Sequence, residues 1–77
     1  MVRLNQRTYD RQWDEIESML EEAELVKRQW QWRFDQCQKN KQTQGMKDAA
    51  RNFKALEGVI KTLKWVLGED GIEDPLE

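Results

Sequence analysis

Apolar side chains recur every three or four residues in two separate segments of the chain. That spacing places the apolar side chains of each segment on one line along an α-helix, which we call a seam. The first seam follows a heptad pattern in which only Lys27 is polar, and its apolar members are Tyr9, Trp13, Ile16, Leu20, Ala23, Trp30, Phe34 and Cys37. The second seam consists of Met46, Ala49, Phe53, Leu56, Ile60, Leu63 and Leu67. The pattern predicts an all-α fold with helices over about 6–40 and about 46–67.

The residues between the two segments, 41–45, decide between one long helix and a hairpin. Continued through this stretch, the first seam would next reach positions near 41 and 48, whereas the second seam starts at Met46. The two seams therefore differ by two residues, roughly 200° around a straight helix. We expect a turn instead, with Gly45 ending a helix and Thr43 as a possible cap. The result is one domain over residues 1–77, an antiparallel two-helix hairpin that resembles a coiled coil. A domain-swapped arrangement opened at Gly45 also satisfies the register.

Two seam positions carry side chains with chemistry of their own. The hairpin register places Cys37 opposite Ala49, so its thiol is expected to be packed in the core. Lys27 is expected to run its aliphatic stem along the seam and extend its ammonium outward. The alternative is that Lys27 pairs with Glu57 or with an acidic group from another chain, which would fix the register.

The first predicted helix is the longer of the two and overhangs the second by about 15–20 Å. The overhang carries Tyr9, Trp13 and Ile16. The acidic tail, residues 68–77, has glycines that allow it to bend back, so that Ile72 and Leu76 would cover the overhang. Otherwise a second chain is needed to cover it.

Each predicted helix also has a second set of apolar residues outside its seam. This excess predicts self-association, most simply as a dimer that forms a four-helix bundle. The expected oligomer interface consists of Tyr9, Trp13, Ile16, Ala55, Val59, Thr62 and Val66. Large outward-facing side chains are the expected anchors for a different partner, and these are Leu25, Trp32 and Trp65.

Charge is unevenly distributed, although the net charge is only −2. Residues 1–26 carry three basic and seven acidic side chains, residues 27–64 carry ten and three, and residues 65–77 carry five acidic side chains only. The hairpin is therefore expected to have an acidic open end and a basic turn end. The basic patch at the turn comprises Lys39, Lys41, Lys47, Arg51 and Lys54. A protein partner is favoured over nucleic acid, because the isoelectric point of about 5.2 opposes attraction to a polyanion. The alternatives are an anion-binding module that binds nucleic acid or a nucleotide at the basic turn end, and a structural protein whose activity is self-association.

The composition lacks the side chains on which most catalytic and metal sites depend. Histidine is absent and cysteine occurs once, which excludes a zinc site, a disulfide framework and a histidine-activated nucleophile. Neither the acidic residues of the first helix nor the segment 68–74 has the spacing of a calcium loop. We expect no enzymatic activity, no cofactor and no bound metal.

The polar character of the chain argues against a membrane partner. Hydrophobic residues make up 38% and charged residues 36% of the 77 positions, and no run approaches the ~20 apolar residues of a spanning helix. Since the beginning of the chain also lacks the apolar region of a signal peptide, we expect a cytoplasmic protein. A chain of this length buries only about 60% of its unfolded surface, so its core is marginal without a partner.

The closing stretch RNFKALEGVIKTLKWVLGEDGIEDPLE, which follows a tryptophan-rich first helix, resembles small helical proteins encoded by bacteriophages and prophages. The shared features are a short, charged pair of helices, a W-V-L-G helix end and an acidic D-P-L tail. The resemblance implies a protein that binds and inhibits a host or defence factor in the host cytoplasm, or a small accessory part of a virion. It assigns no site residues.

Overall fold

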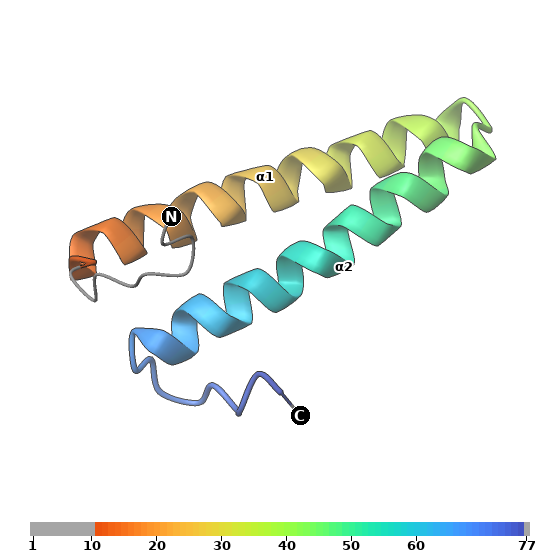
Figure 1. Ribbon diagram of the computed structural model, residues 1–77. Helices are drawn as coiled ribbons and strands as arrows, with labels where there is room; N and C mark the ends of the chain where they lie inside the picture. The colour runs from red at the N-terminus through yellow and green to blue at the C-terminus, as the bar shows by residue number, and fades with distance from the viewer. Residues whose placement is uncertain (1–10, 77) are drawn as a thin grey trace, which may run out of the picture.

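The computed structural model describes residues 11–76, which form two α-helices and no strand in that range. Helix α1 spans Trp13–Lys39 and helix α2 spans Thr43–Val66. Figure 1 shows the two helices side by side and antiparallel at the turn, and farther apart toward the open end. The predicted all-α hairpin is confirmed. Residues 6–10 of the predicted first helix lie outside the described residues, and α1 begins later than predicted because Gln12 is still extended (φ −76°, ψ 152°).

Glu15 fixes the beginning of α1. Its carboxylate accepts a hydrogen bond from the Gln12 backbone N–H (3.1 Å) and another from the Arg11 guanidinium (2.8 Å). These two interactions, the backbone one first, hold the pKa of the Glu15 carboxyl below its ordinary value of 4.5. A negative charge here also interacts favourably with the positive end of the helix dipole.

The connection between the helices is a Schellman motif built around Lys41. Gln42 N–H donates to the carbonyl of Cys37 (2.8 Å) and Lys41 N–H donates to the carbonyl of Gln38 (3.2 Å). Lys41 adopts the left-handed conformation that this motif requires (φ 57°), a conformation that normally favours glycine. The chain therefore reverses direction within residues 40–42.

The predicted role of Gly45 as a helix end is corrected by the structure, because Gly45 lies inside the first turn of α2. Thr43 is the first residue of α2, and the preceding Gln42 occupies the capping position without a side-chain cap. A Cβ atom on Gly45 would lie 2.5 Å from the Sγ atom of Cys37. The close approach of α1 and α2 favours glycine at this position. Helix α2 starts at Thr43, three residues before the predicted position 46.

The core is thin. Within residues 11–76, only Ala23, Cys37, Ala49 and Ile60 are buried, and all four are predicted seam positions. Of the larger described seam residues, Trp13 is exposed. The others are half-exposed, namely Ile16, Leu20, Trp30, Phe34, Met46, Phe53, Leu56, Leu63 and Leu67. Two helices joined in a hairpin thus leave much of their apolar surface in contact with water.

The tail leaves α2 through a second Schellman motif, this time built on glycine. Gly68 has a left-handed backbone (φ 73°), and Glu69 N–H donates to the carbonyl of Lys64 (3.1 Å). The tail then follows α2 (Figure 1), where Pro75 lines a shallow hollow together with Val59. The expectation that the tail covers the open end of α1 is not met. Leu76 is 94% exposed and Trp13 is 65% exposed.

Candidate functional site

The outward-facing side of α1 presents a large aromatic ring. Trp32 is 64% exposed, and Leu25 is 48% exposed one heptad before it. Seven residues correspond to nearly two full turns, so both side chains lie on one line along the helix. This agrees with the sequence expectation that Trp32 and Leu25 lie outside the seam.

A shallow hollow of about 390 Å³ lies beside Trp32, and its wall is made entirely by α1. Its lining residues are Val26, Gln29, Trp30, Trp32 and Arg33. The guanidinium of Arg33 lies 5.2 Å from the ring centre of Trp30, within the range of a cation–π interaction. We call this group of five residues the aromatic hollow. It combines apolar walls with one positive charge, which suits an apolar side chain flanked by a carboxylate.

Sequence reasoning identified Trp32 but not the hollow beside it. The other four lining residues occupy positions 26, 29, 30 and 33, the spacing of neighbours on one helix surface. That spacing is the signal from which the hollow was predictable. Trp65, the third expected anchor, is also exposed, but it belongs to α2 and does not line the aromatic hollow.

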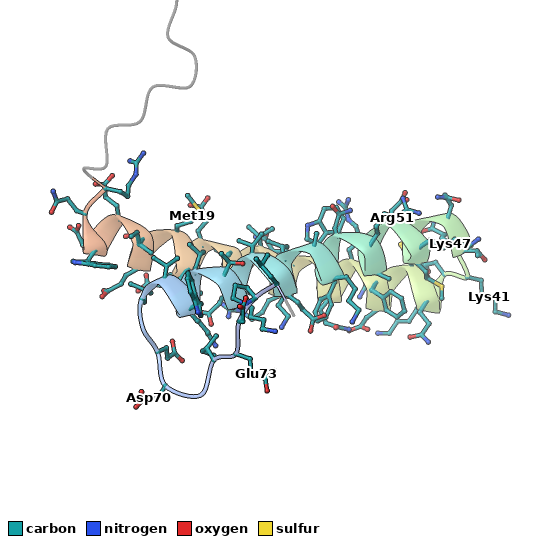
Figure 2. The ribbon with its side chains drawn as sticks, turned by 60° about the horizontal axis from the view of Figure 1, so that its bottom comes forward. Met19, Lys41, Lys47, Arg51, Asp70 and Glu73 are labelled. Atoms are coloured by element: carbon teal, nitrogen blue, oxygen red, sulfur yellow. The ribbon has the colours of Figure 1, made fainter. Side chains whose placement is uncertain are left out.

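The five residues of the predicted basic patch are all exposed around the turn. Figure 2 shows Lys41 and Lys47 at the turn end, with Arg51 slightly farther along α2. Two members of the patch have acidic neighbours. Arg51 Nη1 lies 3.6 Å from a carboxylate oxygen of Asp48, and Lys54 Nζ lies 3.6 Å from one of Glu57. Both pairs are exposed and weak, so the patch keeps its positive character.

Lys27 lies on the seam, and its ammonium lies against an aromatic ring of α2. Its ammonium lies 4.9 Å from the ring centre of Phe53, while Glu57 pairs with Lys54. Lys27 as a whole is half-buried. Lys27 therefore contributes a cation–π contact between the two helices.

The predicted oligomer interface is only partly brought together. Tyr9 lies outside the described residues, and Trp13, Ala55 and Val66 are exposed. Ile16 lines a hollow between the helices with Met19 and Leu63. Val59 and Thr62 line the hollow that Pro75 borders.

The described residues show neither a metal-ligand cluster nor a membrane-spanning helix. Within residues 11–76, no three His, Cys, Asp or Glu side chains gather as metal ligands do. Neither α1 nor α2 is long and apolar enough to cross a membrane. Comparison of the chain with protein-family models, curated proteins and solved structures finds no match.

Proposed function

We propose that this protein acts without catalysis, by stoichiometric binding of another protein to the outer side of α1. The observation that carries the proposal is Trp32, a ring 64% exposed beside the aromatic hollow on a regular helix. A large side chain held on a helix loses little conformational freedom on binding, and tryptophan is enriched among the residues that dominate interfaces.

The chemistry of the surface selects the kind of partner. An apolar side chain fits against Val26 and Trp30 in the aromatic hollow, and a carboxylate beside it would pair with Arg33. The basic patch at the turn extends this preference to a wider acidic surface. Its charges would mainly accelerate and orient the encounter, because exposed ion pairs add little affinity. The proposed partner is therefore a protein with an acidic surface and a protruding apolar side chain.

The resemblance to bacteriophage and prophage proteins supports a more specific form of the proposal. In that form, binding inhibits a host or defence factor in the cytoplasm. This step rests on the resemblance alone, and the binding surface is argued independently of it.

Trp32→Ala tests the proposal directly. Burying the exposed part of a tryptophan contributes about 3 kcal/mol, so the substitution should weaken binding roughly 100-fold. The measurement is capture of partners from bacterial lysate by tagged protein, followed by calorimetry with each purified partner. Circular dichroism verifies that the variant keeps its helices.

Trp65→Ala is the matched control, since it removes an equally large exposed ring from the other helix. Unchanged affinity of Trp32→Ala, or a larger loss in Trp65→Ala, would contradict the assignment to α1. Retention of oligonucleotides instead of protein, with affinity that falls steeply with salt and is lost in Arg51→Glu/Lys54→Glu, would favour an anion-binding function.

A further inference from the structure

Apolar side chains from both helices lie on one side of the hairpin. Met19 and Val26 are one heptad apart on α1, and Val59 and Val66 are one heptad apart on α2, so each pair falls on a line along its helix. Leu63 lies between the members of the α2 pair. Met19 and Leu63 line one hollow, which shows that the two lines share a side. We call these five residues the apolar face.

The opposite side of the hairpin has a different character. A hollow there is lined mainly by polar and charged side chains around Phe53 and Ile60, and these are Glu24, Lys27, Arg28, Gln31 and Lys64. Of these two sides of the described hairpin, the side with Met19 and Leu63 combines apolar residues from both helices. The side chains of the charged side are well solvated by water, whereas burial of the apolar face against a partner is energetically favourable.

The chain on its own does not cover the apolar face. Met19 is 54% exposed and Val59 is 44% exposed, although both adjoin the core. The tail borders the face at its α2 edge through Pro75 and leaves Met19 open. A second layer of helices would bury this surface in the manner of a four-helix bundle.

The distribution of charge along the hairpin indicates which partner fits. Residues 33–54 at the turn end carry six basic and two acidic side chains, while residues 11–24 at the open end carry one basic and six acidic. The tail adds four acidic residues over 69–74. Figure 2 shows Met19 and Arg51 pointing to the same side of the hairpin, Met19 toward the open end and Arg51 toward the turn. The apolar face therefore has an acidic end and a basic end.

We infer that two copies of the chain bind each other through the apolar face in an antiparallel arrangement. A two-fold axis that lies in the plane of the interface and runs perpendicular to the helices, near Val26 and Val59, places each basic turn end opposite the acidic open end of the other copy. A parallel arrangement would place like charges together. The face covers roughly 30 Å by 20 Å, or about 600 Å² in each copy. This is at the lower end of the area that specific protein interfaces bury.

The dimer and the binding of another protein use adjoining surfaces that share Val26. Trp32 lies about 120° around α1 from Val26, so it remains accessible when the apolar face is covered. Val26 lies at the border of both surfaces. Self-association is measured on the purified chain alone, and its failure would leave the proposal for Trp32 untouched.

The first test measures mass in solution by sedimentation equilibrium at chain concentrations of about 10 to 500 µM. The wild-type chain should reach the mass of a dimer within this range. Val59→Glu and Met19→Glu each bring a charge to an exposed position on the face and should weaken the dimer at least about tenfold. Gln31→Glu adds the same charge on the opposite side and should leave the dimer unchanged.

The measurement overturns the inference if the wild type stays monomeric throughout. It also does so if both face variants, with helicity intact by circular dichroism, keep the mass of the wild type. Higher salt should weaken the dimer by about threefold or more between 0.05 and 0.3 M, because screening reduces the attraction of opposite ends. An unchanged or stronger dimer at higher salt would contradict the antiparallel pairing.

The second test measures orientation. A spin label on Lys41→Cys in the Cys37→Ala background is mixed with isotope-labelled chain that carries no label. The antiparallel dimer predicts broadened resonances at residues 14–18 of the unlabelled copy. Broadening at residues 39–47 of that copy instead would show a parallel dimer and overturn the proposed arrangement.

Discussion

The substitution Gly45→Ala produces two opposing effects on stability at the turn end of the hairpin. Alanine is favoured over glycine in a helix by about 0.5–1 kcal/mol, the lower value applying near a helix end. The new Cβ would lie 2.5 Å from the Sγ atom of buried Cys37, a distance that forces the thiol or α2 to move. Overpacking of this kind costs about 1–3 kcal/mol. The free energy of unfolding should therefore fall by about 1 kcal/mol.

The same substitution should reverse its sign when the thiol is removed. In Cys37→Ala the nearest atom of residue 37 to the new methyl group is the Cβ, at 3.5 Å, an ordinary van der Waals contact. Gly45→Ala should then stabilise the Cys37→Ala variant by about 0.5–1 kcal/mol. The coupling between the two positions is expected to be about 1.5–2 kcal/mol, well above the error of a double-mutant cycle.

Urea unfolding followed by far-UV circular dichroism measures these differences in the four variants at one low chain concentration. Gly58→Ala is the matched control, because a Cβ there would meet nothing within 4 Å. It should stabilise the protein by about 0.5–1 kcal/mol with or without Cys37. If Gly45→Ala stabilises the wild type as Gly58→Ala does, then α1 and α2 do not approach each other closely at Gly45 and Cys37, and the reasoning is refuted.

Two further predictions concern the ends of α1. Lys41→Gly should raise the free energy of unfolding by about 0.5–1 kcal/mol, because glycine adopts the left-handed backbone of this position at no steric cost. Thermal unfolding measures the change, and Lys41→Ala controls for the lost charge. A lower Tm in Lys41→Gly would contradict the prediction. Titration of Glu15 by NMR should give a pKa below 4.5. Since that pKa is depressed by folding, the stabilisation is present above pH 4.5 and is lost as the pH falls through the folded pKa. The protection of first-turn amides of α1 against hydrogen exchange, relative to the intrinsic rate at each pH, should fall in that range and should change less with pH in Glu15→Gln. A titration at or above 4.5 would refute the hydrogen bonds assigned to Glu15.

The helices and the residues of their seams were predictable because burial imposes a period of 3.6 residues. The pairing across the hairpin was not, since Cys37 was expected opposite Ala49 but lies against Gly45. The buried residues Ala23, Cys37, Ala49 and Ile60 all occupy predicted seam positions. Local backbone preference identified the second helix end correctly, since Gly68 adopts the left-handed conformation that glycine permits.

The position of the first turn was not predictable from local preference. Gly45 was interpreted as a helix end, but the structure shows that the absence of a side chain at this position leaves room for Cys37 of the other helix. Lys41, which has no special preference for a left-handed backbone, adopts one because packing of the helices determines where the chain must reverse. Both features depend on tertiary contacts.

The candidate site was likewise predictable only where helical periodicity determines it. Exposure of Trp32 and Leu25 follows from helical periodicity alone. The aromatic hollow depends in addition on how the ring of Trp30 and the guanidinium of Arg33 are oriented, and the path of the tail depends on contacts that no periodicity describes. Such details require coordinates of the side chains.

The position of Cys37 gives the protein an internal reporter of its own opening. Cys37 carries the only thiol in the sequence. It is packed against the first turn of α2 and is 8% exposed. An alkylating reagent reaches it only when the helices separate at the turn end, so the rate of modification counts those separations. Any partner that holds the hairpin closed should slow the reaction, and a partner that exchanges helices with it should speed the reaction.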